Sequence, residues 1–178
     1  MKAATSRFKS LQYGRGALGA LTNEGEEMGM NDQVIEILLV EDDPQDVEMT
    51  LLALTGDHLK NEIQVARDGE EALDFLFCQG PHSGRSIAHP PRLVLLDLKL
   101  PKIDGLEVLR ELRARPETRN IPVAVLTSSA EQRDIVETYK LGVNSYIQKP
   151  VDSAQFRQTV KTIGYYWLVV NRPPPAPV

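Results

Sequence analysis

The stretch Leu93-Val94-Leu95-Leu96-Asp97-Leu98-Lys99-Leu100-Pro101 decides the fold of this chain. Four consecutive apolar residues lead to a single aspartate, which is typical of a strand that is buried on both faces and carries Asp97 at its carboxyl end. Open α/β sheets bind their ligands at that end of the strands. Taken alone, Asp97 is more simply explained as a residue that caps the strand or turns the chain. Only charged residues at the ends of other strands can favour a functional role for it.

Four further segments have the pattern of strands, and helical segments separate them. The expected strands cover 35–40, 62–66, 121–126 and 143–148 in addition to the strand at Leu93. Asp43 suits an N-cap before Pro44, and Ser129 with Gln132 resembles a capping box, so helices are expected to start there. The pairs Asp68-Gly69 and Asp104-Gly105 open two more helices, and the last helix starts at about Asp152. This alternation predicts an α/β protein with a doubly wound parallel sheet and right-handed crossovers.

Polar side chains follow four of the expected strands. They are Glu41 and Asp42 after the first strand, Asp97 after the third, Thr127 after the fourth and Lys149 after the fifth. Because parallel strands end at one edge of a sheet, we expect these side chains to lie close together. Acids at a helix start also favour the helix dipole, which is the simpler explanation of Glu41 and Asp42. The alternative is a cation site, since converging carboxylates repel unless an ion such as Mg²⁺ lies between them.

The residue types at this edge favour phosphoryl chemistry. A carboxylate such as Asp97 can attack phosphorus and form an acyl phosphate, while a metal ion and Lys149 neutralise the phosphoryl oxygens and Thr127 donates a hydrogen bond. The sequence has no Walker loop or glycine-rich fingerprint, so a nucleotide is not the expected donor. His82 and His89 have no partner ligands at metal spacing and are expected in a solvated loop.

The composition excludes several classes of function. A net charge of -5 without a basic cluster argues against direct binding of nucleic acid. The single cysteine, Cys78, cannot form an intrachain disulfide and is expected to be a reduced thiol on a helix. No apolar run has the length of a membrane span and no signal peptide is recognisable, so we expect a cytoplasmic protein without membrane contact.

The 178 residues fit one domain with tails. We expect 1–32 to be a mobile leader, 33–170 to be the domain with an extended last helix, and 171–178 to be a proline-rich tail with no second domain. The natural start is Met1, Met28 or Met30. The loop over 79–92 is rich in Gly, Pro, Ser and His, and a loop of this length is typically functional or mobile.

The motifs ILLVEDD, LVLLDLKLPKIDG, VLTSS and YIQKP, spread over residues 35–163, resemble those of the receiver domain of two-component response regulators. The resemblance implies a flavodoxin-like (βα)5 fold of strand order 2-1-3-4-5. It implies that Asp97 accepts a phosphoryl group from a phosphohistidine of a partner histidine kinase. It also implies Mg²⁺ held by Asp42, Asp97 and the backbone carbonyl of Lys99, with Glu41 acting through water. Such a protein is a signalling phosphoacceptor and not a turnover enzyme.

The resemblance implies further roles near the site. Thr127 would bond to the phosphoryl group, Lys149 would bridge to it, and Tyr146 would be the switch aromatic that turns inward and alters the fourth helix, fifth strand and fifth helix. The bond between Lys149 and Pro150 is expected to be cis. Lys99 departs from the polar neutral residue that many receivers carry two positions after the acceptor, close enough to the phosphoryl group to affect its hydrolysis.

The long loop and the segment Gly164-Tyr165-Tyr166-Trp167-Leu168 are similar, more narrowly, to the single-domain regulators paired with phytochrome-type histidine kinases. Four large apolar residues surround the final helical turns, more than one face against a sheet can bury. We therefore expect Tyr165, Tyr166, Trp167 and Leu168 to form an interface for a homodimer or a partner. The simpler alternative is that Trp167 completes the core.

Two other functions would use the same residues. An aspartyl-phosphate phosphatase also has a nucleophilic aspartate at a strand end, but normally carries a second aspartate two positions later, where this chain has Lys99. A phosphate-independent interaction module would keep the acidic pocket without using it.

Overall fold

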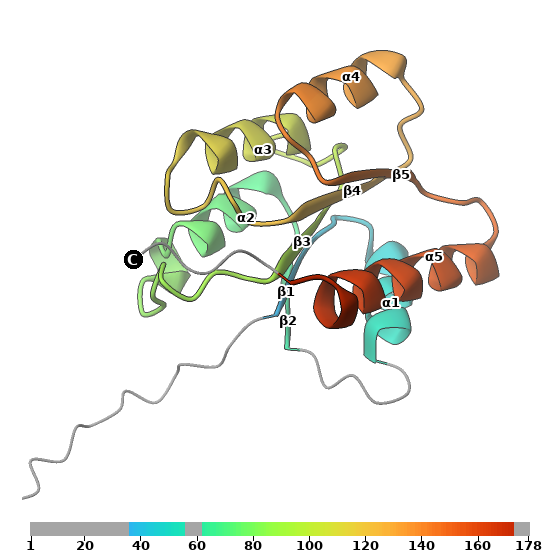
Figure 1. Cartoon of the computed structure of the whole chain (residues 1–178), viewed down its shortest axis with the longest axis horizontal. Helices are drawn as coiled ribbons and strands as arrows, with labels where there is room; N and C mark the ends of the chain where they lie inside the picture. Colours follow the sequence, from blue (N-terminus) through green and yellow to red (C-terminus); the bar gives the residue numbers. More distant parts are fainter. Residues whose placement is uncertain (1–35, 56–61, 173–178) are drawn as a thin grey trace, which may run out of the picture. The chain divides into compact units, whose positions relative to one another are not determined.

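The structure, a computed structural model, describes residues 36–55 and 62–172 (Figure 1). Its five strands form one parallel sheet in the order β2-β1-β3-β4-β5, which confirms the flavodoxin-like order. The strands are β1 (Ile37–Val40), β2 (Ile63–Ala66), β3 (Leu93–Leu96), β4 (Val123–Thr127) and β5 (Ser145–Gln148). The helices are α1 (Pro44–Thr55), α2 (Gly69–Leu76), α3 (Gly105–Ala114), α4 (Gln132–Lys140) and α5 (Ser153–Tyr165), with a short 3-10 helix η1 (Gly80–His82) and a π-helical turn η2 (Tyr166–Val170).

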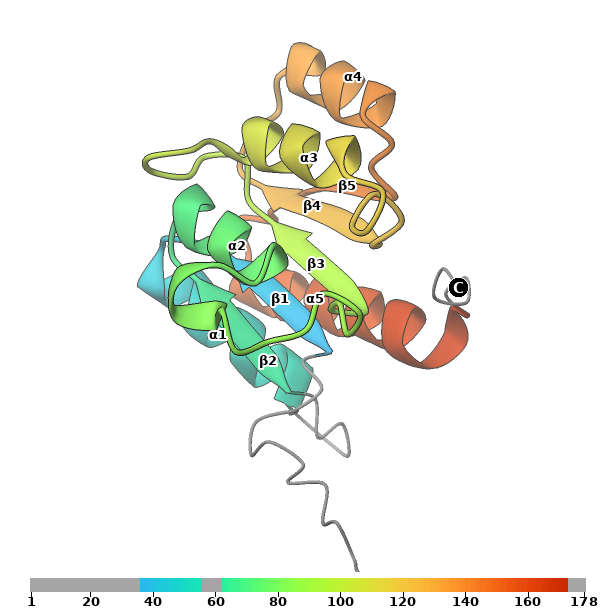
Figure 2. The same cartoon turned by 90° about the vertical axis from the view of Figure 1, so that its left-hand side faces the viewer.

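Helices cover both faces of the sheet, as the alternation predicts. Helices α1 and α5 lie together on one face, and α2 and α3 lie on the other with α4 beside α3 (Figures 1 and 2). Successive strand residues point to opposite faces, so Val94 and Leu96 enter the core under α2 and α3, whereas Leu93 and Leu95 enter the core under α1 and α5. Each such leucine contributes about 2 kcal/mol by burial, so β3 is fixed on both sides.

Aspartate side chains begin four helices at the expected places. Oδ1 of each accepts a hydrogen bond from a backbone N–H of the first turn, and the four are Asp43, Asp68, Asp104 and Asp152. The capping box at Ser129 is wrong, because α4 begins only at Gln132. The Ser129 hydroxyl instead donates to Oδ2 of the buried Asp134 at 2.6 Å, and this pairing takes the serine away from the helix end.

The segment after α2 differs from the prediction at one residue. Helix α2 ends at Leu76, so Cys78 lies beyond the helix, half-buried and with a φ of 55°. The loop over 79–92 is mostly exposed and is fixed to α2 by Arg85. Its guanidinium stacks 3.6 Å from the centre of the Phe75 ring and donates to the Phe75 carbonyl at 2.6 Å.

The end of the last helix is fixed at the amino edge of the sheet. Arg92, just before β3, lies 3.3 Å from Oε1 of Glu36 and donates to the carbonyl oxygen of Leu168 at 2.9 Å. These bonds connect η2 to the residues that precede β1 and β3.

Several predictions concern residues outside the described ranges. The leader over 1–32, with the alternative starts Met28 and Met30, lies there, as do residues 173–178 of the proline-rich tail. Among the described residues no peptide bond is cis, so the bond between Lys149 and Pro150 is trans and that expectation is wrong. None of the described helices combines the length and apolar character that crossing a membrane requires.

Candidate functional site

The carboxyl edge of the sheet brings together the polar residues selected from the sequence. Val40 pairs with Leu96 in the parallel register, which places Glu41 and Asp97, the residues that follow β1 and β3, side by side. Thr127 is the last residue of β4, and its carbonyl accepts a hydrogen bond from the Lys149 backbone N–H at 2.8 Å. Four strands therefore deliver an acid, a second acid, a hydroxyl and an ammonium to one place.

Lys149 is the centre of this arrangement. Its Nζ lies 2.7 Å from each of three carboxylate oxygens, Oε2 of Glu41, Oδ2 of Asp46 and Oδ2 of Asp97. An ammonium has three donor hydrogens, so these contacts use all of them. The Lys149 side chain is only 9% exposed, which strengthens the electrostatic attraction.

Asp46 was not selected from the sequence. It lies in the first turn of α1, where an acid is common because it favours the helix dipole. Lys149 follows it by 103 residues in the chain, and only the tertiary structure brings the two together.

A second cluster overlaps the first. Glu41, Asp42 and Asp97 each offer a carboxylate oxygen, and these oxygens lie within 4.8 Å of one another. Glu41 and Asp97 are buried whereas Asp42 is exposed, so the cluster is open to solvent on one side. Oxygen donors with an open side are the ligands that Mg²⁺ takes in proteins. The donor set therefore fits a small divalent cation.

Burial and pairing shift the pKa values of the site in different directions. Burial raises the pKa of Glu41 to about 7 against the opposing effect of Lys149. Burial would also raise the pKa of Asp97, but hydrogen bonds from Lys149 and from the Lys99 N–H outweigh it, and the pKa of Asp97 is lowered. Asp97 is thus ionised at neutral pH, as a nucleophile must be.

Lys99 and Thr127 flank the Asp97 carboxylate. The Lys99 backbone N–H donates to Oδ1 of Asp97 at 3.0 Å, while its ammonium points to Oε1 of Glu131 at 3.8 Å. The hydroxyl of the buried Thr127 helps to lower the pKa of Asp97, and it accepts a bond from the Ser129 N–H at 3.3 Å. The loop before α4 is thus connected by a hydrogen bond to Thr127, at the edge of the site.

Tyr146 contacts the same loop from β5. Its hydroxyl donates to the Ser129 carbonyl oxygen at 2.9 Å, and its ring packs half-buried against the core under α2 and α3. Ser129 therefore connects Thr127 to Tyr146, because it is hydrogen-bonded to both side chains.

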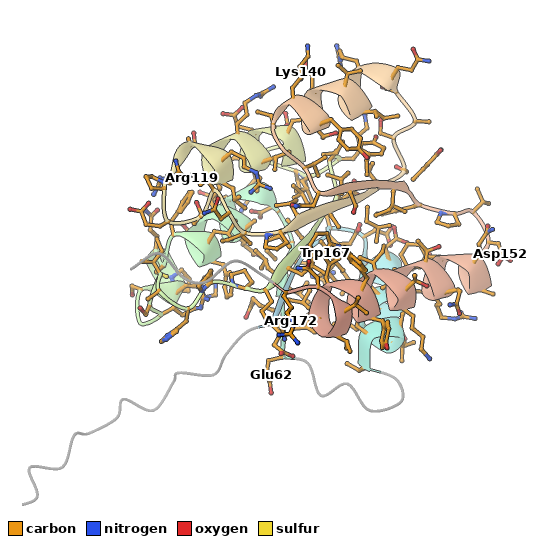
Figure 3. All side chains as sticks on the ribbon, in the orientation of Figure 1. Glu62, Arg119, Lys140, Asp152, Trp167 and Arg172 are labelled. Atoms are coloured by element: carbon orange, nitrogen blue, oxygen red, sulfur yellow. The ribbon has the colours of Figure 1, made fainter. Side chains whose placement is uncertain are left out.

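The aromatic segment at the end of α5 divides between surface and core. Tyr165 and Tyr166 are 55% and 49% exposed. Trp167 packs half-buried on the side of the helix that faces the sheet (Figure 3), with its ring edge to face against Tyr166. Leu168 is 7% exposed and belongs to the core under α1 and α5, so it is not available as a contact surface.

Comparison with known proteins identifies relatives over most of the chain. The family described as "Response regulator receiver domain" matches residues 37–161. Response regulator Rcp1 of Synechocystis is 39% identical over 132 residues, which cover 74% of this chain and 88% of Rcp1. FilR2 of Methanothrix harundinacea, named a "probable methanogenesis regulatory protein", is 40% identical over 152 residues, which cover 85% of this chain and 95% of FilR2.

Solved structures with the same fold carry related names. The phosphorylated cyanobacterial phytochrome response regulator RcpA has a TM-score of 0.74 and 40% identity, covering 78% of this chain and 97% of RcpA. The Mn²⁺-bound form of Rcp1 has a TM-score of 0.73 and 37% identity, covering 78% of this chain and 98% of that structure. The bacteriophytochrome response regulator AtBRR has a TM-score of 0.60 and 50% identity, covering 76% and 96%.

Phosphorylation by a kinase is the general mechanism of this family, and its receiver domain is a signalling module rather than a turnover enzyme. With the acids, the hydroxyl and the lysine gathered at one sheet edge and a family match over most of the described residues, this chain belongs to the response regulator receiver domain family.

Proposed function

We propose that this chain is a phosphoacceptor in a phosphorelay and that Asp97 takes a phosphoryl group from a phosphohistidine of a sensor histidine kinase. An oxygen of the Asp97 carboxylate forms a bond to phosphorus, the N–P bond of the phosphohistidine breaks, and the imidazole nitrogen keeps the electron pair and takes up a proton. The observation that carries this proposal is the Lys149 ammonium 2.7 Å from Asp97, beside a buried hydroxyl and converging acids.

Mg²⁺ is the proposed cofactor. Asp42, Asp97 and the backbone carbonyl of Lys99 would hold it, with Glu41 acting through water. The ion would neutralise phosphoryl oxygens, as divalent cations do in phosphoryl transfer. The convergent carboxylate oxygens support this proposal, and so does the Mn²⁺-bound form of the relative Rcp1.

Intact-protein mass spectrometry tests the phosphoacceptor role. Incubation with acetyl phosphate and Mg²⁺ is expected to add one phosphoryl group to the wild-type protein and none to Asp97→Asn. The matched control is Asp152→Asn, an exposed aspartate at the start of α5 where asparagine also caps, and it should gain the group.

The same experiment separates the alternatives. No mass gain in the wild-type protein would contradict the proposal and favour a phosphate-independent interaction module. Continuous hydrolysis of a phosphate ester that Asp97→Asn abolishes would favour an aspartyl-phosphate phosphatase instead.

We propose a phytochrome-type histidine kinase as the partner. The names of RcpA and AtBRR support this class of kinase. FilR2, whose sequence identity to this chain equals that of RcpA, carries the name of a methanogenesis regulator. Transfer of phosphate from purified phytochrome kinase to Asp97 within seconds, with transfer from an unrelated histidine kinase at least about 100-fold slower, would support it. Equal rates from both kinases would contradict the pairing.

We further propose that phosphorylation moves Thr127 toward the phosphoryl group and turns Tyr146 inward, which alters the surface of α4, β5 and α5. The hydrogen bond from Tyr146 to the Ser129 carbonyl supports this route, because it connects β5 to the loop after Thr127.

A homodimer through the end of α5 is the proposed output. The exposed Tyr165 and Tyr166 supply apolar area, with Trp167 behind them, and the buried Leu168 does not take part. Sedimentation is expected to show a smaller assembly for the Tyr165→Ala, Tyr166→Ala double variant than for wild type. The control is Leu52→Ala, an exposed apolar residue on α1. An unchanged assembly mass of the double variant would contradict the proposed interface.

A further inference from the structure

Asp46 is a site residue that the proposed function does not use. Its Oδ2 lies 2.7 Å from Nζ of Lys149, as close as the oxygens of Glu41 and Asp97. Its side chain is 24% exposed, so the pair is partly shielded from solvent. Asp46 is not one of the three acids whose oxygens converge as candidate cation ligands. Its carboxylate therefore faces the lysine and not the cation cluster.

We propose that Asp46 is a positioning residue that holds the Lys149 ammonium over the reacting carboxylate while Asp97 takes up the phosphoryl group. The inference rests on the proposed function, because it assigns Asp46 a part in that reaction. It adds a residue that neither the sequence motifs nor the cation cluster identifies.

The number of donors on Lys149 explains why an additional anchor is needed. All three ammonium hydrogens are used before the reaction, one of them by Oδ2 of Asp97. When Asp97 becomes an acyl phosphate, the contact with its carboxylate has to pass to a phosphoryl oxygen. During this exchange the flexible lysine side chain is held only by Glu41 and Asp46. Glu41 also belongs to the cation cluster, whereas Asp46 does not. Of the two carboxylates, only that of Asp46 therefore contacts the lysine without also being a candidate cation ligand.

The local structure fixes Asp46 for this role. The side chain of Asp43 begins α1 and accepts a hydrogen bond from the Asp46 N–H at 3.1 Å, so the first helical turn starts directly after the acids of β1. Asp46 of that turn contacts the side chain of Lys149, the residue that follows β5. If Asp46 served only the helix dipole, its loss would lower stability without changing the reactivity of Lys149 or Asp97.

Two measurements test the proposal in the full chain. The first is the initial rate of phosphorylation by acetyl phosphate with Mg²⁺, followed by intact mass. The second is the rate at which limiting acetic anhydride acetylates Lys149, followed by peptide mass spectrometry without a phosphoryl donor. The variants are Asp46→Ala, Asp46→Ser, which suits a first helical turn but is too short to reach the ammonium, and Asp46→Asn, whose amide oxygen still accepts a hydrogen bond.

The anchoring role predicts opposite changes in the two rates. Asp46→Ala and Asp46→Ser should be phosphorylated about tenfold more slowly, the effect of losing one charge-assisted hydrogen bond, and Lys149 should be acetylated severalfold faster. Asp46→Asn should recover most of both wild-type rates. Glu48→Ala removes the same charge from an exposed position two residues later, and both rates should stay at the wild-type values.

The outcomes distinguish this inference from the proposed function. If wild-type protein gains no phosphoryl group, the proposed function fails, whatever the acetylation rates are. If wild-type protein is phosphorylated and the Ala and Ser variants match it in either rate, the role of Asp46 fails and the proposed function stands. Thermal melting of each variant shows whether it is folded. If Asp46→Ala is unfolded, the rates of Asp46→Ser and Asp46→Asn test the role of Asp46.

Discussion

Asp68 connects the start of α2 to the loop that follows the site. Its Oδ1 accepts a hydrogen bond from the Glu71 N–H at 2.9 Å, and its Oδ2 lies 2.7 Å from Nζ of Lys102. Lys102 has a φ of 62° and also pairs with Glu70 at 3.1 Å. Burial would raise the pKa of Asp68, but the bonds from Lys102 and from the helix outweigh it, and the pKa lies below its usual 3.8.

A lowered pKa makes the contribution of Asp68 to stability depend on pH. The contribution is complete above about pH 3.8, the unfolded value, and is lost as the pH falls through the lower folded value. Asp68→Asn keeps a helix-capping side chain but removes the charge. We expect its urea midpoint to lie below that of wild type at pH 7 and to approach it near pH 2.

Asp104→Asn is the matched control for this measurement. Asp104 caps α3 through the Glu107 N–H in the same way but is exposed. A difference between Asp68→Asn and wild type that stays constant from pH 7 to pH 2 would show that the charge is not responsible.

Single residues of the site differ in how far the sequence predicts them. Glu41, Asp42, Asp97 and Lys149 are identifiable because charge directly follows an apolar strand, an unusual placement. Asp46 has no such signal, since an acid in a first helical turn is common. Its role depends on Lys149, which follows β5 and is 103 residues away in the chain, and no local pattern contains this contact.

Helix α3 approaches the site more closely than any side chain would permit. A Cβ at Gly105 would overlap the carbonyl oxygen of Asp97 and lie 2.7 Å from Cα of Leu98. These neighbours are backbone atoms of the chain that leaves β3, so they cannot turn away as a side chain would. The glycine at the first position of α3 therefore sets the spacing between the helix and the chain that leaves β3 at Asp97.

Gly105→Ala is expected to push α3 away from β3. We expect a loss of about 1–3 kcal/mol in the free energy of unfolding, the usual cost of overpacking, together with a slower phosphorylation of Asp97. Urea denaturation and intact mass measure the two effects. Gly84→Ala is the control, because a Cβ at Gly84 would meet no atom within 4 Å. Equal stability of the two variants would contradict this account of the close approach.

The elements were predictable where one residue controls a boundary. Aspartates at helix starts accept hydrogen bonds from the first turn regardless of the rest of the fold, and four such starts were correctly placed. Ser129 failed because the buried Asp134 attracts its hydroxyl. The strand expected over 143–148 is shorter in the structure, where β5 covers Ser145–Gln148. The pattern of apolar residues indicates which residues are buried, but it does not show where the hydrogen bonds of the sheet begin.

The site concentrates negative charge at one edge of the whole domain. Four carboxylates, from Glu41, Asp42, Asp46 and Asp97, meet one ammonium, from Lys149. Repulsion among like charges opposes folding, and a cation that binds only the folded chain opposes that repulsion. Metal binding and global stability should therefore be linked.

Mg²⁺ is expected to raise the melting temperature. At a concentration 100-fold above Kd the stabilisation is about 2.7 kcal/mol, which corresponds to roughly 5–10 °C for a domain of this size. EDTA should reverse the shift in calorimetry. Asp42→Asn should lose most of it, whereas Asp43→Asn, the neighbouring acid outside the cluster, should keep it. A shift of equal size in both variants would contradict the assigned ligands.

At the scale of the molecule, alternation of strands and helices was sufficient for the fold class but not for the strand order. Crossover direction after β1 and after β2 decides which strand is central, and nothing in the local pattern specifies it. The order 2-1-3-4-5 followed from the family resemblance and is confirmed. The sequence also predicted that Tyr165 and Leu168 lie at an interface. Composition alone cannot tell that Leu168 faces inward while Tyr165 faces outward.

The hydrogen bond from Arg92 to the Leu168 carbonyl oxygen holds the final helical turn near the amino ends of β1 and β3. Asp97 follows the opposite end of β3, a strand of four residues, which spans roughly 13 Å. A fluorophore on Arg172→Cys in a Cys78→Ser background would therefore be attached well outside the reaction pocket. Energy transfer between labelled copies can then record self-association in real time while a kinase delivers phosphate unobstructed.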